Sequence, residues 1–107
     1  MADLQVDNIF IPAFDYNSEQ PRFYSKHFLR QDPAKYDLKL WEIAAATSAA
    51  PVYFNPFTYV DGYNITEYLI DGAVIANDPA FLAYETAKSL DNERNITILS
   101  IGTGIFP

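Results

Sequence analysis

The feature that most limits how this chain can fold is the pair Asp71-Gly72, which stands between two apolar runs. Asp-Gly tolerates the positive φ angles of a tight turn, so the pair could join two strands of a β-hairpin. It could equally end a strand at Asp71 and let the chain turn at Gly72 toward a helix. The helix-start signal Asp78-Pro79 follows too soon for a second hairpin strand of ordinary length. The spacing therefore favours the strand-end interpretation.

This interpretation organises the second half of the chain into a βαβ unit. Residues 66–70 are typical of a strand, and residues 79–90 of a helix with Asp78 as its N-cap. Residues 95–101 form a continuous apolar run, which is typical of a strand buried on both faces of a parallel sheet. A right-handed crossover would join the two strands. We therefore expect an α/β fold with a mostly parallel sheet that ends in this βαβ unit.

The first half of the chain predicts two strands and one helix. Residues 4–16 are rich in β-branched and aromatic side chains, and residues 22–28 follow after a turn as a shorter strand. Residues 38–50 predict a helix that begins after Asp37 and is stopped by Pro51. The second half of this helix is almost entirely Ala, Thr and Ser. Because such small side chains allow close approach to a sheet, we expect this helix to be buried.

The composition of the 107-residue chain excludes several classes of site. Its formal net charge is −7, and its few Lys and Arg are scattered, so no basic stripe is present to bind nucleic acid. The absence of Cys excludes disulfides and thiolate zinc sites, and the single histidine, His27, excludes a histidine-rich metal site. No metal and no cofactor is therefore expected. No signal peptide or transmembrane run is evident, which favours a cytoplasmic location.

The sequence gives little support for a catalytic nucleophile within this chain. No serine lies in a Gly-x-Ser-x-Gly motif. Around Ser48, alanines occupy the two glycine positions of that motif, but this segment lies inside a predicted helix. His27 lies in a polar stretch and is expected at the surface. Gly102 and Gly104 follow an apolar run, but a dinucleotide fingerprint would need a third glycine where Pro107 stands.

Two aspartates remain as candidates for a catalytic role. Asp61 and Asp71 both precede a glycine, but only Asp71 follows a clear strand and precedes a capped helix. A carboxylate at that position could act as a general base, orient one, or accept hydrogen bonds from local N–H groups. The residues alone leave these three roles open.

Three segments, in order, resemble the C-terminal half of a patatin-like phospholipase domain: "WEIAAATSAAPVYF" (41–54), "LIDGAVIANDP" (69–79) and "ILSIGTG" (98–104). Residues upstream of them also resemble the paired strands that precede the helix in that family. The resemblance implies a partial three-layer α/β/α fold, with residues 1–107 as the C-terminal portion of one domain.

The resemblance also implies a chemistry. Members of the family are lipid acyl hydrolases that use a serine-aspartate dyad and need no histidine. Their Asp-Gly-Gly/Ala motif falls on Asp71-Gly72-Ala73, which makes Asp71 the expected acceptor of the serine proton. The expected substrate is an acyl lipid or phospholipid, reached by transient contact with a membrane surface.

This chain departs from the family pattern because the serine elbow and the glycine-rich oxyanion loop, which precede this region in the family, are absent from residues 1–107. Two hypotheses follow. In the first, these residues are the C-terminal part of a longer lipid acyl hydrolase. In the second, the chain is a truncated, non-catalytic fragment that associates with proteins, or with itself, through an exposed sheet edge.

Overall fold

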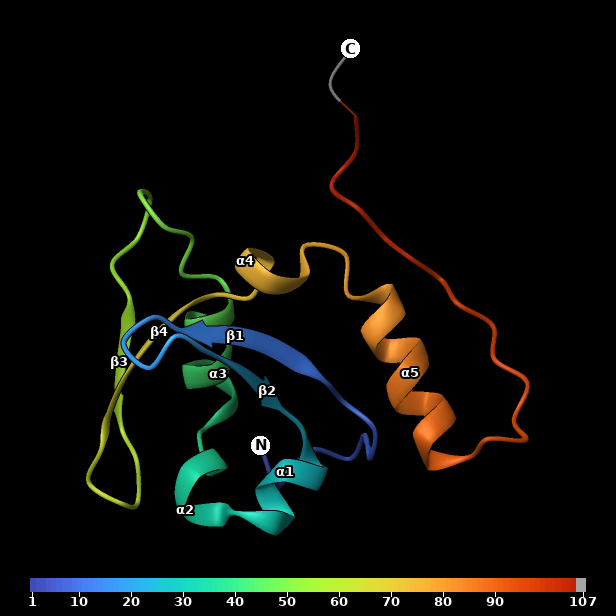
Figure 1. Ribbon diagram of the computed structural model, residues 1–107, viewed down its shortest axis with the longest axis horizontal. Coiled ribbons are helices and arrows are strands. Elements are labelled where there is room, and N and C mark those ends of the chain that lie inside the picture. Colours follow the sequence, from blue (N-terminus) through green and yellow to red (C-terminus); the bar gives the residue numbers. More distant parts are fainter. Residues whose placement is uncertain (106–107) are drawn as a thin grey trace. The chain divides into compact units, whose positions relative to one another are not determined.

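The computed structural model describes residues 1–105 (Figure 1). The chain divides into two compact units, one formed by Met1–Asn77 and a second that begins at Asp78. The first unit contains a β-sheet and four short helices. The second contains one longer helix followed by an extended segment.

Four strands form the sheet of the first unit: β1 (Ile11–Asp15), β2 (Gln20–Tyr24), β3 (Phe57–Val60) and β4 (Thr66–Asp71). Their order across the sheet is β2-β1-β4-β3, and each neighbouring pair is antiparallel. The predicted α/β content is confirmed, whereas the prediction of a mostly parallel sheet is wrong for the described residues. For two of the three pairs the reason is local: turns of four and five residues join β1 to β2 and β3 to β4, and such short connections can join only antiparallel strands.

Four helices belong to the first unit: α1 (Lys26–Gln31), α2 (Pro33–Tyr36), α3 (Leu40–Thr47) and α4 (Ala73–Ala76). The predicted strand 22–28 is therefore wrong in its second half. Ser25 ends that extended stretch and caps α1, because its Oγ accepts a hydrogen bond from the Phe28 N–H at 3.2 Å.

The predicted helix 38–50 is present as α3, but it begins later than expected. Asp37 is not its N-cap; Lys39 takes that position, and the Lys39 N–H donates to Glu42 Oε2 at 2.7 Å. A glutamate in the first turn thus supplies the stabilising contact that the sequence analysis assigned to Asp37.

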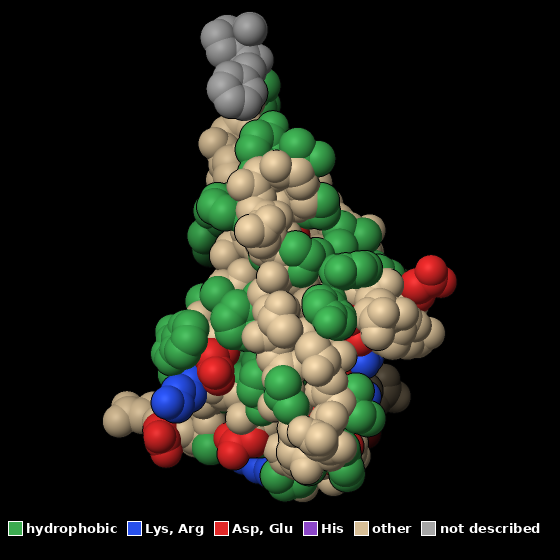
Figure 2. Space-filling model, turned by 90° about the vertical axis from the view of Figure 1, so that its left-hand side faces the viewer, with side chains coloured by type: hydrophobic (Ala, Val, Ile, Leu, Met, Phe, Trp, Pro, Cys, Tyr) green, Lys and Arg blue, Asp and Glu red, His purple; other side chains and the backbone are tan. Residues whose placement is uncertain are grey.

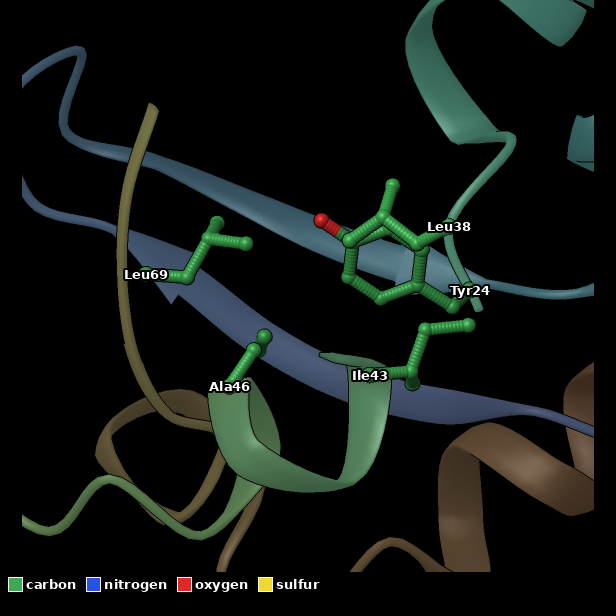
Figure 3. Packing of buried hydrophobic residues seen from close by; sticks show 6 residues of the cluster. Tyr24, Leu38, Ile43, Ala46 and Leu69 are labelled. Atoms are coloured by element: carbon green, nitrogen blue, oxygen red, sulfur yellow. The ribbon is translucent and has the colours of Figure 1, made fainter. Parts of the chain in front are cut away.

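Helix α3 packs against one face of the sheet, and Figure 3 shows the side chains that meet there. Ile43 and Ala46 of α3 point toward Leu69 of β4 and Tyr24 of β2, and all four are fully buried. The expectation that the small-residue helix is buried is confirmed for this face. The short Ala46 side chain allows the helix to lie close to the sheet.

A cluster of charged side chains lies on the same buried face. Arg22 donates from Nη2 to Asp15 Oδ2 at 3.4 Å and from Nε to Glu67 Oε1 at 3.2 Å. The three side chains are at most 9% exposed. Burial raises the pKa of Glu67 above its ordinary value, although the Arg22 charge opposes that shift. The cluster joins β1, β2 and β4, and Arg22 is the cation that pairs with both carboxylates.

The second unit contains α5 (Ala80–Leu90). This helix begins one residue later than predicted, because Pro79 and not Asp78 is its N-cap; Asp78 Oδ1 still accepts a hydrogen bond from the Ala80 N–H at 3.2 Å. The predicted strand 95–101 is wrong: these residues pair with no strand, and Leu99 and Ile101 are each 84% exposed. The predicted βαβ unit is therefore not formed in the described residues, because a strand exists only where a neighbour completes its hydrogen bonds.

No helix within residues 1–105 has the length and apolar character needed to cross a membrane.

Candidate active site

Asp71 is the last residue of β4, at the point where the sheet gives way to α4. It stands opposite Ala13 of β1 in the antiparallel register, and α4 starts two residues later at Ala73. The strand-end interpretation of the backbone is therefore confirmed, because residues 73–76 are helical and cannot form the second strand of a hairpin.

Backbone contacts fix this strand end against the C-terminus of α3. The Asp71 N–H donates to the Ala49 carbonyl at 3.1 Å, and the Gly72 N–H reaches the Thr47 carbonyl at 3.4 Å. The Thr47 hydroxyl in turn donates to the Pro12 carbonyl at 2.6 Å, which connects α3 to β1. The small residues at the end of α3 thus position Asp71 as well as filling the core.

The two carboxylate oxygens of Asp71 have different surroundings. Oδ1 accepts a hydrogen bond from the Ala73 N–H at 2.8 Å, whereas Oδ2 accepts none from residues 1–105. The side chain is half-buried. One oxygen is therefore oriented by the backbone, while the other is available to accept a proton from a hydroxyl group placed beside it.

Gly72 is required by close contact with β1. Its φ of −63° is ordinary, but a Cβ atom on this residue would lie 2.3 Å from the Pro12 carbonyl oxygen. No side chain fits at that distance unless β4 and β1 move apart. The glycine after Asp71 therefore allows the strand end to lie against the neighbouring strand.

We expect Gly72→Ala to lower the free energy of unfolding by about 1–3 kcal/mol, the usual cost of overpacking a tight contact. Gly102→Ala is the matched control, because a methyl group added there would meet nothing within 4 Å; it should change the unfolding free energy by less than about 0.5 kcal/mol. Urea unfolding followed by circular dichroism measures both. Equal stability of the two variants would contradict the contact.

The second Asp-Gly pair has a structural role in this fold. Asp61 is buried, and its Oδ1 accepts hydrogen bonds from the N–H groups of Tyr63 at 2.9 Å and Ile65 at 3.0 Å. These bonds hold the turn between β3 and β4. Asp61 also directly follows a strand, because β3 ends at Val60, so the expectation that only Asp71 lies at the end of a clear strand is wrong.

The side chains of Ser48 and His27 have contacts other than Asp71. Ser48 is exposed at the end of α3, where its hydroxyl donates to the Ala44 carbonyl at 2.7 Å, an ordinary contact for a helical serine. His27 is exposed on α1 and packs edge-on against Phe28. Within residues 1–105, no hydrogen bond links either side chain to Asp71, and no cluster of three His, Asp or Glu could hold a metal ion.

Comparison with known proteins decides the family. Residues 3–84 match the family model for patatin-like phospholipases, and this match includes the Asp71-Gly72-Ala73 motif. The chain belongs to the patatin-like phospholipase family. The resemblance inferred from the motifs is therefore confirmed.

Plant patatins are among its relatives. Patatin-like protein 1 of Arabidopsis thaliana is 39% identical over 115 residues, covering 91% of this chain and 27% of the relative. Patatin-like protein 4 of the same plant is 33% identical, covering 95% of the chain and 29% of the relative. Patatin of Solanum tuberosum is 33% identical, and the match covers 90% of this chain and 29% of the relative. The chain thus spans less than a third of the length of these patatins.

Proposed function

We propose that residues 1–107 are the C-terminal portion of a patatin-like lipid acyl hydrolase, in which Asp71 accepts the proton of a catalytic serine. The observation that carries this proposal is the position of Asp71 at the end of β4, with Oδ1 held by the Ala73 N–H and with no hydrogen bond to Oδ2 from residues 1–105. In this proposal a preceding part of the polypeptide supplies the serine elbow, the oxyanion loop and the remaining layers of a three-layer α/β/α domain.

The chemistry of the proposed dyad needs no further base. The serine oxygen attacks the ester carbonyl carbon while its proton passes to Asp71 Oδ2. The protonated carboxyl group then returns that proton to the departing alcohol, which leaves an acyl-serine. Water hydrolyses the acyl-serine by the same sequence, with Asp71 again as the acceptor. The Ala73 N–H keeps the carboxylate oriented through both halves of the cycle.

The proposed substrates are acyl lipids or phospholipids, met at a membrane surface. Exposed apolar side chains follow α3, with Val52 fully exposed, Tyr53 83% exposed and Phe54 65% exposed. Figure 2 looks onto the β3 side of the chain, where hydrophobic side chains are spread with only a few charged ones between them. This surface supports a shallow, transient contact with lipid.

The second candidate is a truncated, non-catalytic chain that acts by association. It is favoured by the outer edges of β2 and β3, which pair with no other strand within residues 1–105. Unpaired edges expose backbone N–H and C=O groups that a second copy of the chain can bind.

The intact mass of the native protein distinguishes the two. We expect an antibody against residues 79–94 to capture a protein well above 12.1 kDa that releases fatty acid from phosphatidylcholine vesicles. A captured protein of 12.1 kDa that releases none and self-associates at micromolar concentration would support the second candidate instead.

A further inference from the structure

The hydrogen bonds between β1 and β4 stop one step short of where the register would carry them. In antiparallel strands every second pair of opposite residues exchanges hydrogen bonds. The Tyr16 N–H donates to the Tyr68 carbonyl at 3.1 Å, which identifies the pairs that do so. Counted in steps of two along the register, the next bond after the end of β4 would run from the Gly72 N–H to the Pro12 carbonyl.

Thr47 of α3 takes both partners of that bond. Its hydroxyl donates to the Pro12 carbonyl at 2.6 Å, and its own carbonyl lies 3.4 Å from the Gly72 N. Because Pro12 has no N–H, the pair could make no second bond in its place. One residue therefore ends the pairing of β4 with β1 directly after Asp71. The sequence analysis counted Thr47 only among the small residues of a buried helix.

The other side of β4 is ended by the same segment. Successive N–H groups of a strand point to opposite sides, so the Asp71 N–H points away from β1. On that side β3 begins at Phe57, opposite Leu69, and does not extend as far as Asp71. The Ala49 carbonyl accepts the Asp71 N–H at 3.1 Å instead. Residues 47–49 thus set the end of β4 on both sides.

The strand end decides how the Asp71 carboxylate is held. Its Oδ1 accepts the N–H of Ala73, two residues further along the chain, at 2.8 Å. In an extended strand that residue would lie about 6.5 Å away, too far for this bond. The contact exists because the chain leaves the strand at Gly72. If β4 paired with β1 for one more step, the carboxylate would lose the N–H group that orients it.

We propose that Thr47 is a positioning residue: by ending β4 after Asp71, its hydroxyl keeps the carboxylate in the orientation that accepts the serine proton. This inference rests on the function proposed above and adds the residue that sets the geometry of the base. What matters at position 47 is then a hydrogen-bond donor, and the size of the side chain is secondary.

Kinetics of the native protein on a short-chain ester test the role of the hydroxyl. Thr47→Val keeps the size and removes the donor, and it should lower kcat about tenfold or more with little change in KM, because orienting the base affects the chemical step. Thr47→Ser is smaller but keeps the donor, and it should restore kcat to within about threefold of the wild type. A larger loss in Thr47→Ser than in Thr47→Val would overturn the proposal.

Thr86→Val is the matched control. The Thr86 hydroxyl also donates to a backbone carbonyl, that of Leu82 at 2.8 Å, but within α5. Its loss should leave kcat within about twofold of the wild type, and a loss equal to that of Thr47→Val would overturn the proposal. If Thr47→Val does not fold, judged by circular dichroism, Thr47→Cys replaces it. A thiol is a weak donor, so kcat should fall at least about threefold below that of Thr47→Ser; equal values would overturn the proposal.

Hydrogen exchange separates this inference from the proposed function, because it requires no catalysis. In the native protein, Thr47→Val should speed exchange at the Gly72 and Ala73 amides about tenfold or more, whereas Thr86→Val should not. Unchanged exchange in Thr47→Val would overturn this inference and leave Asp71 as the proposed base. Full activity in Asp71→Asn would overturn the proposed function, and with it the catalytic part of this inference.

Discussion

Asp71→Asn is expected to lower ester hydrolysis by the native protein about 10²- to 10⁴-fold, the usual contribution of a general base. An amide of the same shape can still accept the hydrogen bond from the Ala73 N–H, so the end of β4 should keep its structure. The amide oxygen cannot take a proton at neutral pH. The measurements are kcat/KM on a short-chain ester and the thermal unfolding midpoint of each protein.

Asp78→Asn is the matched control for this loss. It makes the same chemical change seven residues away, where the side chain only accepts a hydrogen bond from the Ala80 N–H at the start of α5. The side-chain oxygen of Asn can accept the same hydrogen bond, so activity and stability should both be retained. Asp71 would be removed from the mechanism if its Asn variant kept more than about a tenth of the wild-type rate.

Arg22→Met should have the largest effect on stability. It removes the cation that Asp15 and Glu67 share on the buried face of the sheet and leaves two carboxylates in the core. Breaking a buried ion pair in this way costs about 3–5 kcal/mol. Arg94→Met is the control, because the pair of Arg94 with Asp91 is 59% and 47% exposed, and it should cost less than about 1 kcal/mol. Urea unfolding at pH 7 measures both.

The loss of unfolding free energy caused by Arg22→Met should be smaller at acidic pH than at pH 7. Burial already raises the pKa of Glu67 above its ordinary value of 4.5, and Arg22 is the main group that opposes the shift. Without Arg22 the folded state should bind the Glu67 proton more tightly still. The unfolded state then binds fewer protons than the folded state, so the unfolding free energy of the variant rises as pH falls toward 4.5. If the stability difference between the wild type and Arg22→Met stayed constant between pH 7 and pH 5, the raised pKa of Glu67 could not be its cause.

Local signals account for the parts of the site that the sequence analysis placed correctly. The Asp78-Pro79 signal left too little room for a second strand, and this spacing alone put Asp71 at a strand end. The same kind of signal identified α3 and α5, because capping, proline and small-residue patterns act within a few positions of the chain. The element boundaries were less accurate: α3 begins after Lys39 rather than after Asp37, and the Lys39 N–H donates to Glu42 Oε2.

The tertiary structure decided everything that depends on which distant segments meet. The apolar run 95–101 has the composition of a buried strand, but composition cannot supply the neighbour that a strand needs, and the sheet instead forms from antiparallel pairs. Likewise, Arg22 and Glu67 are 45 residues apart, and only the pairing of β1 with both β2 and β4 brings their charges together. Sequence by itself therefore determined the family and the local placement of Asp71. The pairing of β1 with β4 and the cluster of buried charges required the fold, because each is formed by residues that become neighbours only after folding.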